Sequence, residues 1–190
     1  MHKKHVVLLI LLAFVLGGLV AGAVIMVVET DADRIAEKVS DNRTCVVRDS
    51  IENLDAPEGA LPLSVQEALH TALQDEYSNR ASYLAILERY GDVRPFNTII
   101  VSEERHIAIL GAIYDRYGLE MPPMEPTEVV VGDTLSEACQ LAVEEEVANT
   151  AMYDEILLAV EGYEEIEYAF ENLSRASRDH HKRAFEKCAL

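Results

Sequence analysis

Glu103 and His106 place a carboxylate and an imidazole three residues apart, in a Glu-x-x-His motif. On an α-helix this spacing brings both side chains to one face, about one turn apart. Apolar residues recur around the motif every three or four positions, and the motif lies on their face of the predicted helix. A buried charge is costly unless it is paired or bound to a metal. The motif therefore predicts charged partners or a metal ion on the facing helices.

An internal repeat supplies candidate partners for this motif. Residues 75–87 match residues 145–157 at a constant offset of 70, and the match pairs Glu76 with Glu146. Helices that shared only an apolar rhythm would not share inward acidic, amide and tyrosine residues at one offset. We therefore interpret the match as a true internal repeat.

The second helices of the two halves match at an offset of 74 residues. This alignment carries His106 onto His180 and Glu103 onto Ser177. It predicts that His180 faces the core and that the neighbouring His181 lies on the surface. It also leaves the second half without a twin of Glu103.

Five side chains are predicted to meet at one level of the core: Glu76, Glu103, His106, Glu146 and His180. A ligand set that is rich in oxygen and has two imidazoles suits iron or manganese better than zinc. Tyr83 follows Glu76 by seven residues, and Tyr153 follows Glu146 by the same number, two turns along the same face. Both tyrosines could donate hydrogen bonds to the ligands. In the metal-free alternative, Arg80 neutralises Glu76 or Glu103, because Arg80 lies one turn from Glu76.

The apolar periodicity predicts four helices, over residues 64–90, 95–117, 134–161 and 163–188. Capping-box patterns mark two of the starts, Ser64 with Glu67 and Thr134 with Glu137. The segment 120–133, which contains three prolines, is too long for a tight turn between helices. The predicted fold class is therefore all-α, a four-helix bundle with one long crossover between its second and third helices.

Residues 6–28 form an uncharged, mainly apolar run that follows Lys3 and Lys4. At about 1.5 Å per residue, a helix over this run would span roughly 34 Å, enough to cross a bilayer. Because the lysines should stay inside the cell, the rest of the chain is predicted to be extracytoplasmic. A signal peptide cleaved near residues 21–23, which would yield a secreted protein, is the alternative. The chain thus divides into a membrane anchor, a linker and the bundle, at residues 1–28, 29–63 and 64–190.

The charge balance and the cysteines limit the partners. The formal net charge of −18 argues against nucleic acid or an anionic membrane surface as a partner. Cys139 and Cys188 should lie at the same end of two antiparallel helices, and an extracytoplasmic location would permit a disulfide between them. Cys45 would then be free or bonded to another chain, and a homodimer is left open. The sequence has no Cys-x-x-Cys pair, so redox activity would need an external electron donor.

This pattern of five candidate ligands resembles the ferritin-like, rubrerythrin-like di-metal carboxylate proteins. More narrowly, four stretches are similar to a prokaryotic family of ferritin-like domains of unknown function, over about residues 64–190: Asp-Glu-Tyr at 75–77, Tyr-Gly-Asp-Val-Arg-Pro-Phe at 90–96, Ser-Glu-Glu-Arg-His at 102–106 and Asn-Leu-Ser-Arg-Ala-Ser-Arg-Asp-His-His at 172–181. The resemblance implies a four-helix bundle whose relatives bind two irons and handle oxygen, peroxide or ferrous iron. It places ligands at the same five positions, but Ser177 stands where a full di-iron set has a second bridging glutamate.

We therefore expect a membrane-anchored, extracytoplasmic ferritin-like protein that binds one or two iron ions, with manganese as the alternative metal. Its expected activity is oxidase or peroxide-reducing chemistry. Glu76 and Glu146 would be terminal ligands and Glu103 the bridge, with His106 and His180 as nitrogen ligands. The alternative from another class is a metal-free binding or scaffolding module with a buried network of Glu, His and Arg side chains.

Overall fold

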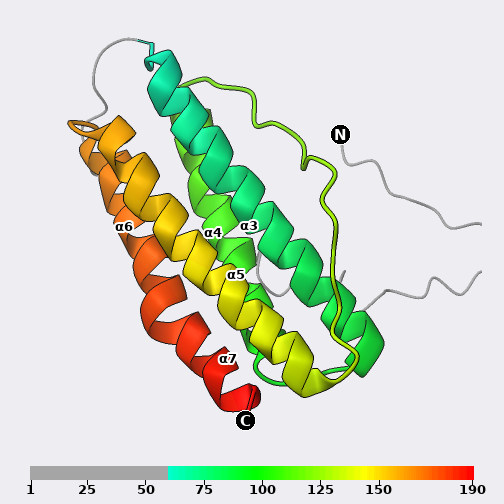
Figure 1. Cartoon of the computed structure of the whole chain (residues 1–190). Coiled ribbons are helices and arrows are strands. Elements are labelled where there is room, and N and C mark those ends of the chain that lie inside the picture. The colour runs from blue at the N-terminus through cyan, green and yellow to red at the C-terminus, as the bar shows by residue number, and fades with distance from the viewer. Residues whose placement is uncertain (1–59) are drawn as a thin grey trace, which may run out of the picture.

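The structure is a computed structural model that describes residues 60–190. These residues form helices but no strand. The elements are α3 (Leu63–Tyr90), α4 (Phe96–Arg116), α5 (Leu135–Ile156), the 3-10 helix η1 (Leu157–Val160), α6 (Glu164–Ala176), the π-helical segment η2 (Ser177–His181) and α7 (Lys182–Cys188). Because α6, η2 and α7 follow one another without a break, they make one long helix, and Figure 1 shows it packed with α3, α4 and α5 in a bundle. The prediction of an all-α bundle is confirmed.

The predicted helix limits agree with the structure to within a few residues, but only one of the two predicted capping boxes is present. The side chain of Thr134 accepts a hydrogen bond from the Glu137 backbone, and the Glu137 side chain accepts one from the Thr134 backbone. At the start of α3 the prediction is wrong, because the N-cap is Pro62 and no side chain caps the helix. The predicted anchor and the predicted linker up to residue 59 lie outside the described residues.

The long crossover between α4 and α5 runs along the outside of α3 (Figure 1). The side-chain amide of Gln74 holds it by two hydrogen bonds, donating to the Pro123 carbonyl at 3.0 Å and accepting from the Glu125 backbone at 2.8 Å. One turn further along α3, Ser78 lies 3.1 Å from Thr127 through their hydroxyl oxygens. The crossover thus returns the chain to the other end of the bundle, so that α5 runs parallel to α4.

Two apolar clusters fill the interior, one towards each end of the bundle. The first contains Tyr153 and Phe170, whose ring centroids lie 5.4 Å apart. The second contains the rings of Tyr83, Phe96 and Phe185, with centroids 4.8–5.6 Å apart. Each cluster therefore places one buried tyrosine hydroxyl towards the middle of the bundle, where the polar side chains lie.

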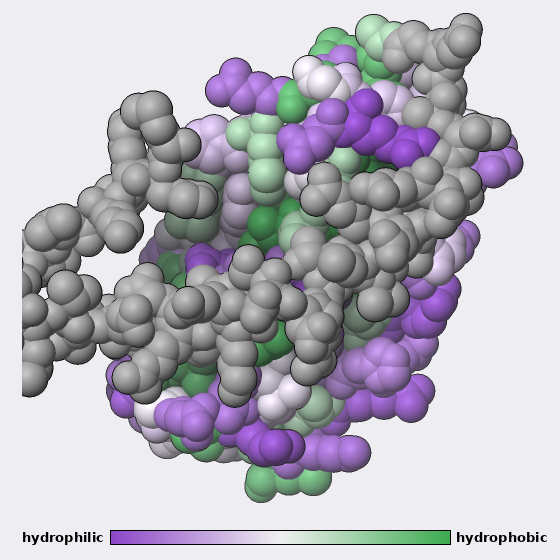
Figure 2. Space-filling view, turned by 180° about the vertical axis from the view of Figure 1, so that it is seen from behind, coloured by the Kyte–Doolittle hydropathy of each residue, from purple (hydrophilic) through white to green (hydrophobic). Residues whose placement is uncertain are grey.

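Most of the exposed residues between 60 and 190 are polar. In the face seen in Figure 2, hydrophilic residues line the right-hand edge, and some hydrophobic residues show nearer the centre. Among large apolar side chains, Leu63, Leu158 and Leu190 are the most exposed, and they lie at helix or chain ends. Between residues 60 and 190, no helix has the length and hydropathy needed to cross a membrane.

The structure contains a disulfide between Cys139 on α5 and Cys188 at the end of α7, with a Cα–Cα distance of 5.7 Å. This confirms the predicted pairing. The bond ties the last turn of the chain to α5 across 49 residues of sequence.

Removing this disulfide should destabilise the bundle, because the reduced chain gains entropy when it unfolds. For a loop of this length, we expect Cys188→Ser to lower the free energy of unfolding by roughly 2–4 kcal/mol. Urea unfolding of the variant and the oxidised wild type would measure the difference. The reduced wild type is the matched control, and equal stability of the reduced and oxidised forms would contradict the expectation.

Candidate metal centre

Five ionisable side chains from the four long helices meet in the middle of the bundle. They are Glu76 on α3, Glu103 and His106 on α4, Glu146 on α5 and His181 at the end of η2. None is more than 5% exposed. Each lies on the inward face of its helix, so folding removes all five from water together.

The five side chains form two overlapping groups that share Glu103. Glu76, Glu103 and His106 make one group, here called the His106 half-site. Glu103, Glu146 and His181 make the other, the His181 half-site. Within each group, one potential ligand atom from each residue lies within 4.8 Å of the others.

The distances within the half-sites are those of direct contacts. Nδ1 of His106 lies 3.0 Å from Oε2 of Glu76 and 3.3 Å from Oε2 of Glu103. Nδ1 of His181 lies 3.1 Å from Oε1 of Glu103 and 3.4 Å from Oε1 of Glu146. Each histidine therefore contacts one oxygen of Glu103, which lies between the two imidazoles.

The prediction that His180 faces the core and His181 the surface is wrong. His180 is exposed, whereas His181 is 4% exposed and contacts Glu103 and Glu146. The reason is the π-helical segment η2, because a π-helical turn contains an extra residue and rotates everything after it on the helix. The other four predicted residues are brought together as expected.

The burial pattern locates this extra residue. Up to Ser177, the first residue of η2, the last helix matches α4 at the predicted offset of 74, and both Glu103 and its counterpart Ser177 are buried. From His181, the last residue of η2, the matching offset is 75, which pairs His106 with His181 and Leu110 with Phe185. The one sequence signal for the shift was Phe185, which falls on the inward face only at the larger offset.

Two tyrosine hydroxyls donate hydrogen bonds to Glu76 and Glu146. Each tyrosine belongs to the opposite half of the internal repeat from the glutamate that it contacts. Tyr83 donates a 2.8 Å hydrogen bond to Oε1 of Glu146, and Tyr153 donates a 2.7 Å bond to Oε1 of Glu76. Burial, followed by the neighbouring carboxylates, raises the pKa of both tyrosines well above its usual value. They therefore act as hydrogen-bond donors towards the two glutamates.

Arg80 does not neutralise the buried carboxylates. It forms an ion pair with Glu104 on α4, and its side chain is 34% exposed. The pairing of Arg80 with Glu76 or Glu103, predicted in the metal-free alternative, is thus wrong. Glu76 instead contacts His106 and Tyr153, and Glu103 contacts both imidazoles.

Burial and mutual contact shift the pKa values of the cluster strongly. Although burial lowers it, the pKa of His106 rises to about 10 because of Glu76 and Glu103. Burial also lowers the pKa of His181, but contacts with Glu103 and Glu146 outweigh it and raise the pKa to about 9. Burial raises the pKa of Glu76, whereas contacts with the two histidines outweigh burial and lower that of Glu103. The metal-free centre therefore retains protons that a bound cation would displace.

A second, outer layer of acidic groups was not predicted. Oδ2 of Asp75 accepts hydrogen bonds from Asn149 at 2.5 Å and from Asn79 at 3.1 Å. Burial is the main cause that raises the pKa of Asp75 to about 6 and that of Glu145 to about 7. Their positions at equivalent places of the internal repeat were the available signal.

The donor set and its unsatisfied atoms fit a metal cation. Among the described residues, Oε1 of Glu103, Oε2 of Glu146 and Nδ1 of His181 are buried and make no hydrogen bond of normal geometry. Nδ1 of His181 and Oε1 of Glu103 form an ion pair 3.1 Å apart, so Oε2 of Glu146 is the atom left without a partner, at a cost of about 1–3 kcal/mol. Three carboxylates with two imidazoles suit iron or manganese, so a cation here would satisfy atoms that the protein leaves unsatisfied.

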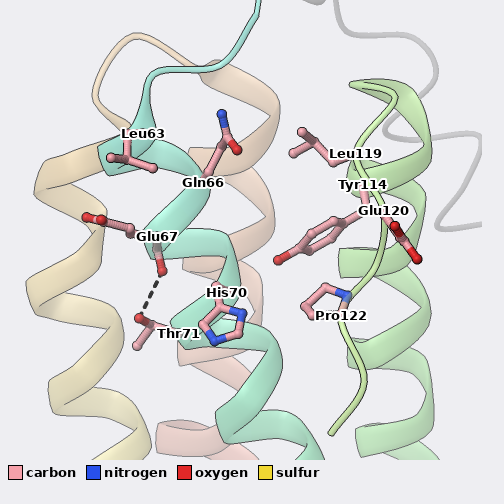
Figure 3. Close-up of a pocket in the computed structure, with 9 residues that line it drawn as sticks. All are labelled: Leu63, Gln66, Glu67, His70, Thr71, Tyr114, Leu119, Glu120 and Pro122. Carbon is pink, nitrogen blue, oxygen red and sulfur yellow. Dashed lines mark hydrogen bonds between the residues drawn. The ribbon is translucent and has the colours of Figure 1, made fainter. Parts of the chain in front are cut away.

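An open groove of about 500 Å³ lies apart from this centre, near the start of α3. Figure 3 shows His70 from α3, Tyr114 from α4 and Pro122 from the crossover around it. None of the five cluster residues lines the groove.

Comparison of the chain with protein-family models gives no match, and comparison with curated proteins gives no significant match.

The metal-free protein should lose stability as the pH rises. Folding raises the pKa of Asp75, Glu145, His106 and His181, so the folded state binds more protons than the unfolded state between about pH 5 and 9. The stabilisation they give is full below their unfolded pKa values and is lost as the pH rises through the folded ones. The lowered pKa of Glu103 acts only in the acid range below this window.

We expect the free energy of unfolding of chelator-treated protein to fall by about 2 kcal/mol or more from pH 5.5 to pH 9. Urea unfolding at several pH values would measure it. Glu145→Gln should reduce the fall in the free energy of unfolding at the acid end of this pH range. Stability that increases with pH would contradict the expectation.

Proposed function

We propose that this chain is a ferritin-like metal-binding protein that holds one or two iron ions in the middle of its bundle. The observation that carries the proposal is the pair of buried half-sites that share Glu103. In this proposal Glu76 and Glu146 are terminal ligands and Glu103 is the bridge. His106 and His181 supply the nitrogen ligands, and manganese is the alternative metal.

The environment of the cluster supports this function. Tyr83 and Tyr153 orient the outer carboxylates by hydrogen bonds, as residues around metal ligands commonly do. The apolar clusters on either side keep bulk water from the ligands. When bound, iron would supply oxidase or peroxide-reducing chemistry, and its electrons would come from an external donor.

We further propose that the bundle is extracytoplasmic and attached to the membrane by residues 6–28, with a cleaved signal peptide as the alternative. The uncharged run and the preceding lysines support the anchor. The Cys139–Cys188 disulfide supports an oxidising compartment, since disulfides are rare where thiols are kept reduced.

The second candidate function is a metal-free binding or scaffolding module. The contact between His106 and Glu76 favours it, because a protonated imidazole can neutralise a buried carboxylate without a metal. The buried Oε2 of Glu146 in the His181 half-site favours the metal instead, since a structural network would be expected to satisfy it.

Metal analysis of the purified 190-residue chain after anaerobic loading with ferrous iron distinguishes the two functions. The wild type should bind one or two ions per chain, and Glu103→Ala should bind none because both half-sites lose the shared ligand. A wild type that binds no ion would reject the metal function and leave the scaffold.

The two adjacent histidines provide a matched pair of variants. His181→Ala should lose at least one ion per chain, whereas His180→Ala should bind as the wild type does, because His180 is exposed. Circular dichroism would verify that both variants stay helical. Loss of metal in His180→Ala with retention in His181→Ala would contradict the assigned ligand.

A further inference from the structure

The two half-sites differ in how well the metal-free protein satisfies their ligand atoms. We propose that metal ions fill the centre in a fixed order, the first in the His181 half-site and the second, more weakly, in the His106 half-site. This inference rests on the proposed metal-binding function and adds an order of occupancy to it.

The His181 half-site is ready to accept a cation. Nδ1 of His181, Oε1 of Glu103 and Oε2 of Glu146 are buried and make no hydrogen bond of normal geometry. Although the first two atoms lie 3.1 Å apart, their contact does not have the geometry of a hydrogen bond. A cation that binds here replaces the ion-pair contacts of His181 with Glu103 and Glu146, at 3.1 Å and 3.4 Å, and gives the unpaired Oε2 of Glu146 a partner.

The His106 half-site is already satisfied by the protein. One oxygen of Glu76 accepts from Tyr153 at 2.7 Å, and the other contacts Nδ1 of His106 at 3.0 Å. The second ring nitrogen of His106 lies 3.3 Å from the hydroxyl of Ser102. A cation that binds here must first break the contact between Glu76 and His106, so its net gain is smaller.

The net charge of the centre also makes the second ion bind more weakly than the first. The three glutamates can carry three negative charges at most, and Ser177 supplies no fourth where the internal repeat would place one. One divalent ion leaves a single negative charge in the centre, so the second ion is attracted less strongly. The first ion also occupies Glu103, the ligand that the two half-sites share.

The test is a titration of the chelator-treated 190-residue chain with Co²⁺, followed by its visible absorption and by isothermal calorimetry. The wild type should show a tight step before a weak one. His181→Ala should weaken the tight step at least about tenfold, because a ligand is lost. His106→Ala should keep the tight step within about threefold and lose the weak one.

Two isosteric variants test the same order if a histidine variant does not fold. Tyr83→Phe removes the hydrogen bond to Glu146 and should weaken the tight step. Tyr153→Phe removes the hydrogen bond to Glu76 and should alter only the weak step. Both phenylalanines keep the buried ring.

The outcomes separate the inference from the function on which it rests. A wild type that binds one ion, lost in His181→Ala and kept in His106→Ala, supports the order. Equal effects of the two histidine variants, or loss of the tight step in His106→Ala alone, overturn it while leaving metal binding in place. A wild type that binds no Co²⁺ overturns the proposed function as well.

Discussion

The burial of three carboxylates against two imidazoles is the constraint on which the rest of this bundle depends. Glu76, Glu103 and Glu146 are each at most 1% exposed, and such groups are stable inside a protein only with compensating partners. The helices supply these partners from four directions, and the two tyrosine hydroxyls supply more. The apolar clusters above and below then hold the helices at the separation that the contacts require.

The two halves of the internal repeat contribute equivalent residues to this centre, except at one position. Each half contributes a glutamate from its first helix, a tyrosine two turns further along and a histidine from its second helix. The tyrosines bond to the glutamate of the opposite half, so neither half completes its own set of contacts. The difference is that Ser177 takes the position of Glu103, and the π-helical segment begins there. The asymmetry between the half-sites therefore arises from one short stretch of the chain.

Much of the fold could be predicted because its determinants are local. Apolar residues at helical spacing defined the four helices, and the prolines between α4 and α5 indicated a crossover. The repeat also identified four of the five cluster residues, since Glu76, Glu103, His106 and Glu146 lie on regular helices where spacing fixes direction. His181 was missed because that rule fails across a π-helical turn, where one extra residue turns the following side chains about the axis.

By itself, the sequence determined which residues are acidic, basic or apolar along each helix, and hence which face turns inward wherever the helix is regular. Only the tertiary structure decided how those faces meet. It placed Glu103 between two imidazoles, joined each tyrosine to the other half's glutamate and directed Arg80 to Glu104. The physical reason is that spacing along a helix reports direction within that helix alone. Contacts between helices depend on their relative rotation and height, which packing of the whole core sets. The π-helical turn is another feature that only the tertiary structure decided, because the burial of His181 and Phe185 reveals its extra residue.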